Sequence, residues 1–77
     1  MGISEKIRIL LIKRNKSQTE LADKCLGITK NCFNNKLRQE KFTKAELEKM
    51  AEYLSAKYNE SPPPRQWFTL NDTGEEI

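Results

Sequence analysis

The sequence predicts a mainly α-helical domain of four helices that ends in an extended arm or a β-hairpin. Apolar residues recur at helical spacing through the first 58 residues, and Ser and Thr stand where they can cap helices. A proline run at 62–64 then precedes a segment rich in strand-forming residues. Because 77 residues suffice for only one compact domain, we expect a helical domain over 1–58 and a proline-rich connector with an arm or hairpin over 59–77.

The first helix is expected over Ser4–Arg14, with one apolar stripe facing the core. Ile9 and Ile12 lie off this stripe and form a second apolar edge that one partner helix cannot cover. Since small domains often gain stability from a second subunit, we predict that Ile9 and Ile12 contact another copy of the chain. The residues of the main stripe are Ile3, Ile7, Leu10 and Leu11.

The second helix is expected to start after Ser17, with Glu20 three residues later completing a capping box. Gly27 ends this helix, because glycine adopts positive φ without steric cost. The side chains expected to face the core are Leu21, Ala22 and Cys25.

Thr29 is expected to cap a third helix over Lys30–Arg38, in which Phe33 and Leu37 stand four apart and point to the core. The other face of this helix is polar, and no carboxylate occurs before Glu40. Its polar residues are Lys30, Asn31, Asn34, Asn35 and Arg38.

A fourth helix should begin at Thr43, which forms a capping box with Glu46, and should run to about Lys57. The extended segment Gln66–Leu70 and the turn residues Asn71–Gly74 then suggest a hairpin with the last residues of the chain. An isolated hairpin is barely stable, so its apolar side chains must dock on the helices or on a partner. These side chains are Trp67, Phe68 and Leu70.

The charge is unevenly distributed along the chain. Residues 1–58 carry 13 Lys and Arg against 7 Asp and Glu, whereas residues 59–77 carry 1 against 4. Excess positive charge on a small domain favours polyanionic partners, because cations that neutralise phosphates release counterions.

Several classes of function are disfavoured by composition. Without histidine, Cys25 and Cys32 cannot complete a zinc site, and we expect both to be buried, free thiols. No signal peptide or membrane span is recognisable, so a cytoplasmic location is expected. We expect no cofactor, no metal, no small-molecule substrate, no membrane contact and no enzymatic activity, since no phosphate loop or paired carboxylates occur.

One combination of residues comprises the helix start Ser17–Ala22, the turn Gly27–Thr29, and the later Phe33 and Leu37. It resembles the helix-turn-helix of the Cro and phage-repressor superfamily, often called the XRE family. The resemblance spans about residues 3–57 and implies a four-helix, lambda-repressor-like domain. It also implies sequence-specific binding of double-stranded DNA, as in bacterial or phage transcription regulators. One residue more than usual separates Ala22 from Gly27, and it is either absorbed by a looser helix end or rotates the recognition helix.

The resemblance places the recognition helix at Thr29–Arg38. Asparagine pairs bidentately with adenine, and Lys and Arg favour guanine or phosphate, so the residue types suit a major groove. Base edges are assigned to Asn31, Asn34 and Asn35, and DNA-facing positions also to Thr29 and Lys30. Phosphates are assigned mainly to Gln18, Lys36, Arg38 and Lys41.

We expect a homodimer that binds a near-palindromic site, with Ile9, Ile12, Trp67, Phe68 and Leu70 as candidate partner contacts. The alternative is an adaptor or antitoxin-like module that uses the same scaffold to hold a protein through the C-terminal hairpin. Fold by itself does not decide between them, because one scaffold hosts several functions.

Overall fold

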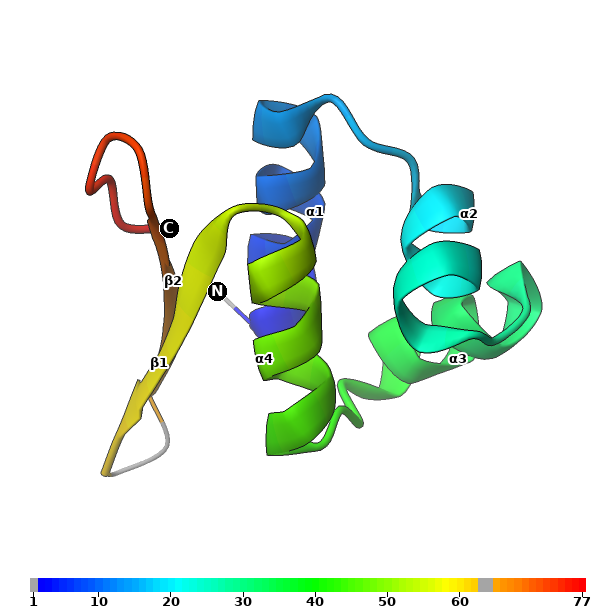
Figure 1. The fold of residues 1–77 in the computed structure, drawn as a ribbon. Helices are drawn as coiled ribbons and strands as arrows, with labels where there is room; N and C mark the ends of the chain where they lie inside the picture. The colour runs from blue at the N-terminus through cyan, green and yellow to red at the C-terminus, as the bar shows by residue number, and fades with distance from the viewer. Residues whose placement is uncertain (1, 63–64) are drawn as a thin grey trace.

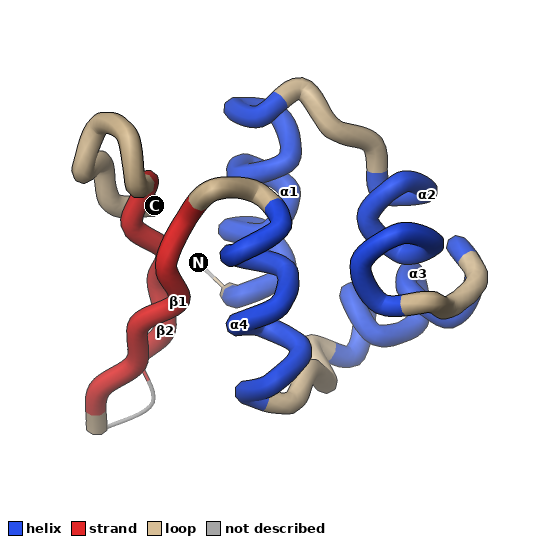
Figure 2. The backbone as a smooth tube through the Cα atoms, in the orientation of Figure 1, coloured by secondary structure: helices blue, strands red, loops and turns tan. Residues whose placement is uncertain are grey.

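The computed structural model describes residues 2–62 and 65–77. The prediction of a small, mainly helical chain with a C-terminal hairpin is confirmed (Figure 1). The hairpin lies on one side of α1 and α4, and the remaining helices lie on the other side (Figure 2). None of the helices in the described residues is long and apolar enough to cross a membrane. The elements are α1 (Ile3–Arg14), α2 (Gln18–Glu20), the π-helical segment η1 (Leu21–Leu26), α3 (Lys30–Gln39), α4 (Lys44–Tyr53), β1 (Ala56–Ser61) and β2 (Arg65–Leu70).

The caps of α3 and α4 form as predicted. The hydroxyl of Thr29 accepts a hydrogen bond from the Cys32 amide at 3.2 Å. At α4, the Thr43 hydroxyl accepts from the Glu46 amide at 3.1 Å, and the Glu46 carboxylate accepts from the Thr43 amide at 2.9 Å. These bonds satisfy backbone donors that a helix start leaves without partners.

The cap of α2 forms only in part. Ser17 accepts from the Glu20 amide at 3.0 Å, as expected, but the Glu20 carboxylate accepts from the Tyr53 hydroxyl of α4 at 2.6 Å. The predicted return bond from Glu20 to Ser17 is therefore wrong. Tyr53 draws the carboxylate into a contact between α2 and α4, which no local pattern indicates.

The second helix ends in a looser, π-helical turn before Gly27, which is the form of helix end in the first of the two expected alternatives. The helix widens into η1, and the Gly27 amide donates to the Ala22 carbonyl five residues back. A π-helical turn accommodates an inserted residue without breaking the helix. Gly27 then ends the segment with a left-handed φ of 66°. α3 begins at Lys30, the residue at which the sequence predicts its start.

The expected extension of the fourth helix to Lys57 is wrong. α4 ends at Tyr53, Ser55 takes a left-handed φ of 56°, and the chain enters β1 at Ala56. Ala56 pairs with Leu70 and Tyr58 pairs with Phe68 in an antiparallel ladder, and all four side chains are buried. These buried cross-strand pairs stabilise the strand, and a continued helix could not form them.

The predictions of a connector and of the hairpin's strands are also corrected, because β2 pairs with β1 and not with a strand formed by the last residues of the chain. The predicted boundary after residue 58 falls inside β1, and both sides of it contribute to one core. Part of the proline run, residues 63–64, lies outside the described residues. The predicted return of the chain along β2 exists, because the Ile77 amide donates to the Phe68 carbonyl at 2.8 Å. It amounts to an isolated bridge between Thr69 and Glu76 and not to a strand.

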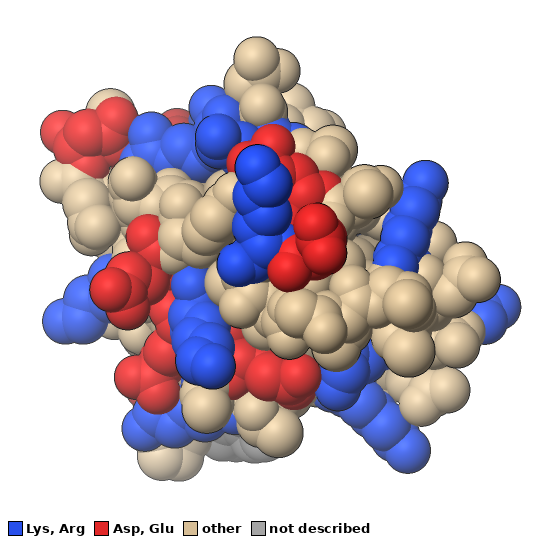
Figure 3. Space-filling model, turned by 45° about the vertical axis from the view of Figure 1, so that its right-hand side comes forward, with Lys and Arg blue, Asp and Glu red and all other residues tan. Residues whose placement is uncertain are grey.

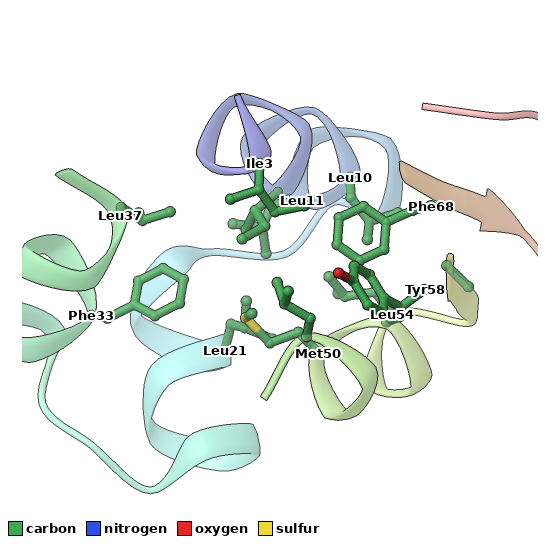
Figure 4. Close-up of a cluster of buried hydrophobic side chains, with 14 of the residues drawn as sticks. Ile3, Leu10, Leu11, Leu21, Phe33, Leu37, Met50, Leu54, Tyr58 and Phe68 are labelled. Carbon is green, nitrogen blue, oxygen red and sulfur yellow. The ribbon is translucent and has the colours of Figure 1, made fainter. Parts of the chain in front are cut away.

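The core gathers side chains from α1, η1, α3, α4 and both strands, and these point toward one another in Figure 4. Phe33 packs against the half-buried Phe42 with ring centroids 5.9 Å apart, and Tyr58 packs against Phe68 at 5.7 Å. The hairpin is therefore an integral layer of this small domain. The buried apolar residues are Ile3, Ile7, Leu10, Leu11, Leu21, Ala22, Phe33, Leu37, Leu47, Met50, Ala51, Leu54, Ala56, Tyr58, Phe68 and Leu70.

Candidate nucleic-acid interface

α3 is anchored from beneath by two side chains of its inner face. Phe33 and Leu37 are 0% and 2% exposed, as predicted from their spacing. The buried hydroxyl of Ser4 on α1 donates to the Leu37 carbonyl. This bond ties α3 to α1 and satisfies a buried hydroxyl that would otherwise cost free energy.

The outer face of α3 carries amides and a guanidinium. Asn31, Asn35 and Arg38 are exposed, and Asn34 is half-buried. Their spacing of three and four residues places all four on one side of the helix. The predicted separation of a polar outer face from an apolar inner face is confirmed.

The same four residues and Arg8 of α1 line an open hollow of about 590 Å³. The sequence did not single out Arg8, because no spacing rule connects residue 8 with residues 31–38. Its place beside α3 follows from the packing of α1 on α3. Arg8 is exposed.

Two side chains of the hollow already interact. The Arg38 guanidinium donates to the Asn35 amide oxygen at 2.5 Å. This bond holds both side chains in place across one helical turn. The amide nitrogen of Asn35 remains the group that can donate to a ligand.

The other predicted contact residues differ in exposure and in whether they already have a partner. Lys36 lies toward α4, where its ammonium is 3.2 Å from the Glu46 carboxylate. Gln18 is half-buried as the first residue of α2. Thr29, Lys30 and Lys41 are exposed. Lys36 is therefore engaged in the structure in a way that its position on a cationic helix did not indicate.

On the face drawn in Figure 3, positive side chains occur throughout, but negative ones are absent from one end. In Figure 3, Asp and Glu lie over the left and central parts of the view, whereas blue and tan atoms cover its right-hand end. Among residues 2–62 and 65–77, neither Arg8 nor Arg38 lies within 4.0 Å of a carboxylate oxygen. The Glu40 carboxylate lies against Gly2, at the start of α1.

The predicted partner contacts are only partly accessible. Ile12 is 78% exposed, and Ile9 is half-buried. Phe68 and Leu70 are buried in the chain's own core, so they are not free to contact a partner. Trp67 is half-buried, and the Arg65 guanidinium lies 5.3 Å from the centre of its ring.

The cysteines differ in environment. Cys25 is half-buried, and burial raises the pKa of its thiol. Cys32 is exposed on α3, contrary to the expectation of burial, because the helix turns it away from Phe33. In the part of the chain that the structure describes, no three His, Cys, Asp or Glu side chains gather in a way that could hold a metal ion.

No protein-family model, curated protein or solved structure matches this chain. The functional interpretation therefore depends on the residues of α3 and its surroundings.

Proposed function

We propose that the chain binds double-stranded DNA with sequence specificity by placing the outer face of α3 in the major groove. In this proposal it acts as a repressor-like transcription regulator of the Cro and phage-repressor type. The observation that carries the proposal is the outer face of α3, where amides and a guanidinium meet with no carboxylate among them. Such a face suits base edges and phosphates, which offer many acceptors.

The dimensions are compatible with this role. A helix of 10 residues is about 15 Å long, and a major groove about 12 Å wide admits one helix. Asn31 and Asn34 are the best candidates for bidentate contact with adenine. Asn35 shares its amide oxygen with Arg38, so these two residues act as a unit.

Phosphate contacts are assigned to two exposed lysines beside this face and to the uncharged, half-buried Gln18. Lys30 and Lys41 are exposed at the two ends of the α3 region, and Gln18 lies at the start of α2. Lys36 has an indirect role, because it pairs with the Glu46 carboxylate that caps α4.

The proposal includes a homodimer on a near-palindromic site, with recognition helices about 34 Å apart. Ile12 and the neighbouring Ile9 form its centre, since Ile12 is the large apolar side chain with the greatest exposure among those described. Light scattering during size-exclusion chromatography should show a dimer. A monomer at high concentration would remove this part of the proposal.

The same exposed Ile12, together with Trp67, favours an adaptor or antitoxin-like module as the second candidate. The two candidates differ in a simple test. A DNA-binding regulator binds mixed-sequence duplexes at low salt, whereas an adaptor binds none and retains a defined protein partner.

Selection from randomised duplexes tests the proposal, followed by titration of the selected duplex with Asn34→Ala. Loss of a bidentate base contact should weaken binding by about 1–3 kcal/mol, or about 5- to 140-fold. Binding of a mixed-sequence duplex should change little, because the phosphate contacts remain. Asn71→Ala, in an exposed turn at the hairpin end, is the matched control. Equal affinity of the two variants for the selected duplex would remove α3 from the interface.

A further inference from the structure

Arg8 stands outside the helix-turn-helix segment, yet it shares a hollow with α3. The hollow is lined by two guanidinium groups, from Arg8 and Arg38, and by three side-chain amides. No carboxylate lines it. The hollow therefore presents positively charged donors and neutral amide groups. Such a surface suits an anion with several acceptor oxygens.

The packing of α1 on α3 holds this arrangement in place. Ser4 lies one helical turn before Arg8, and its hydroxyl donates to the carbonyl of Leu37, the residue before Arg38. Ile7, adjacent to Arg8, is buried in the same core as Leu37. The backbones that carry the two arginines are thus joined by a buried hydrogen bond and by apolar packing, so their relative position is set before binding.

The charge of the hollow is not neutralised by the chain. Neither arginine has a carboxylate within 4.0 Å among the described residues. The one side-chain hydrogen bond of Arg38 in this region goes to the neutral Asn35 amide. Two other cations of α1 are neutralised within the chain, because Lys13 pairs with Glu75 and Arg14 pairs with Asp72.

We infer that Arg8 binds a backbone phosphate of the DNA, at the wall of the groove that α3 enters. This inference rests on the proposed function and adds a contact from α1 to it. Residues of α3 face the base edges, and Arg8 lies beside them on the neighbouring helix, where the phosphates that border the groove come within reach. A guanidinium binds a phosphate bidentately, so Arg8 contributes affinity and orientation but no base preference.

Fluorescence anisotropy with a labelled duplex of mixed sequence tests the inference between about 50 and 200 mM salt. Loss of one phosphate contact in Arg8→Ala should reduce the slope of log affinity against log salt by about 0.9. Arg8→Lys should keep the slope, because the charge remains, and should bind less tightly than the wild type, because bidentate geometry is lost. Arg65→Ala is the matched control, since it removes the same charge from the exposed start of β2.

The outcomes separate the inference from the proposed function. If the wild type binds duplexes and Arg8→Ala has the slope of Arg65→Ala, the role of Arg8 is refuted and the role of α3 stands. If the wild type binds no duplex at low salt, both are refuted. Circular dichroism and thermal melting of Arg8→Ala verify that any loss is not a loss of folding.

Discussion

The two ends of the molecule use their cationic side chains in different ways. At the hairpin end, Arg14 donates to the carbonyls of Leu54 at 2.8 Å and Ser55 at 2.9 Å, and it pairs with Asp72 at 2.7 Å. At the α3 end, Arg8 and Arg38 have no carboxylate within ion-pair distance among the residues described. Arg14 at one end thus holds the fold together, whereas Arg8 and Arg38 at the other end remain available to a ligand.

This difference shows why the net charge of +3 is a poor guide to the surface. The acidic C-terminal segment neutralises cations of α1 through Asp72 and Glu75, and Lys6 donates to the Gln66 carbonyl at 2.5 Å. The excess positive charge of the helical part is thus offset at the hairpin end. Arg8 and Arg38, which have no such partner among the described residues, lie where an anionic partner can reach them.

The largest expected effect tests whether the hairpin end is structural. Phe68 is 0% exposed in the core, so Phe68→Ala should lower the free energy of unfolding by about 3–5 kcal/mol. Urea denaturation followed by circular dichroism measures the change. The control is Arg65→Ala on the same strand, which should cost at most about 1 kcal/mol, because Arg65 is exposed and loses only its contact with the Trp67 ring. Similar stability of the two variants would mean that the hairpin is a detachable arm.

A pair of glycines compares the two ends directly. Gly27 and Gly74 have φ of 66° and 74°, and a Cβ at either position would meet no atom within 4 Å. Gly27→Ala and Gly74→Ala should therefore each cost about 1–2 kcal/mol from backbone strain alone. Only Gly27→Ala should also weaken duplex binding, because Gly27 sets the path into α3. The comparison fails if Gly74→Ala weakens binding equally.

Acid titration probes the Arg14 contact at the hairpin end. The hydrogen bond from Arg14 lowers the pKa of Asp72 to about 2, whereas an unfolded aspartate titrates near about 3.9. Since the folded pKa is the lower one, the stabilisation is complete above about pH 4 and is lost as the pH falls toward about 2. The melting temperature of Asp72→Asn should lack this loss.

Glu76→Gln is the control for the acid titration, because Glu76 is exposed and keeps the Asp72 contact. Its melting temperature should follow the wild type over the acid range. A profile of Asp72→Asn that coincides with the wild type would show that ionisation of Asp72 does not contribute to stability in the acid range.

The smallest effect is expected at the Lys13–Glu75 ion pair. Its charged atoms are 2.7 Å apart, but both side chains are well exposed. Exposed pairs of this kind contribute less than about 1 kcal/mol, so Lys13→Ala should change the free energy of unfolding little. A loss greater than about 1 kcal/mol in urea denaturation would show that the pair contributes more than an ordinary exposed pair.

Local signals predicted the helical part well. Thr29, Thr43 and Gly27 mark helix ends through bonds and backbone angles that involve residues within a few positions. The spacing of Phe33 and Leu37 alone predicts that both lie in the core, because a helix has a fixed period, and both are buried. The outer face of α3 follows from the same period.

Contacts between distant residues were not predictable in this way. Ser55 takes a left-handed φ without being glycine, so no signal marks the end of α4. Tyr58 suits a helix or a strand, and its pairing with Phe68 decides the outcome. The sequence indicates no partner for Lys36 or Arg8. In the structure Lys36 pairs with Glu46, and Arg8 lies beside α3.

The amino-acid sequence by itself determined the helix starts, the turn at Gly27 and the division of α3 into an apolar and a polar face, because these depend on interactions within one or two helical turns. Only the tertiary structure decided that residues 56–61 form a strand and that the acidic tail neutralises α1. It also decided that Arg8 joins the α3 face. These features arise when segments far apart in sequence pack on one core. The free energy of that packing depends on contacts between distant residues, so no local pattern predicts it.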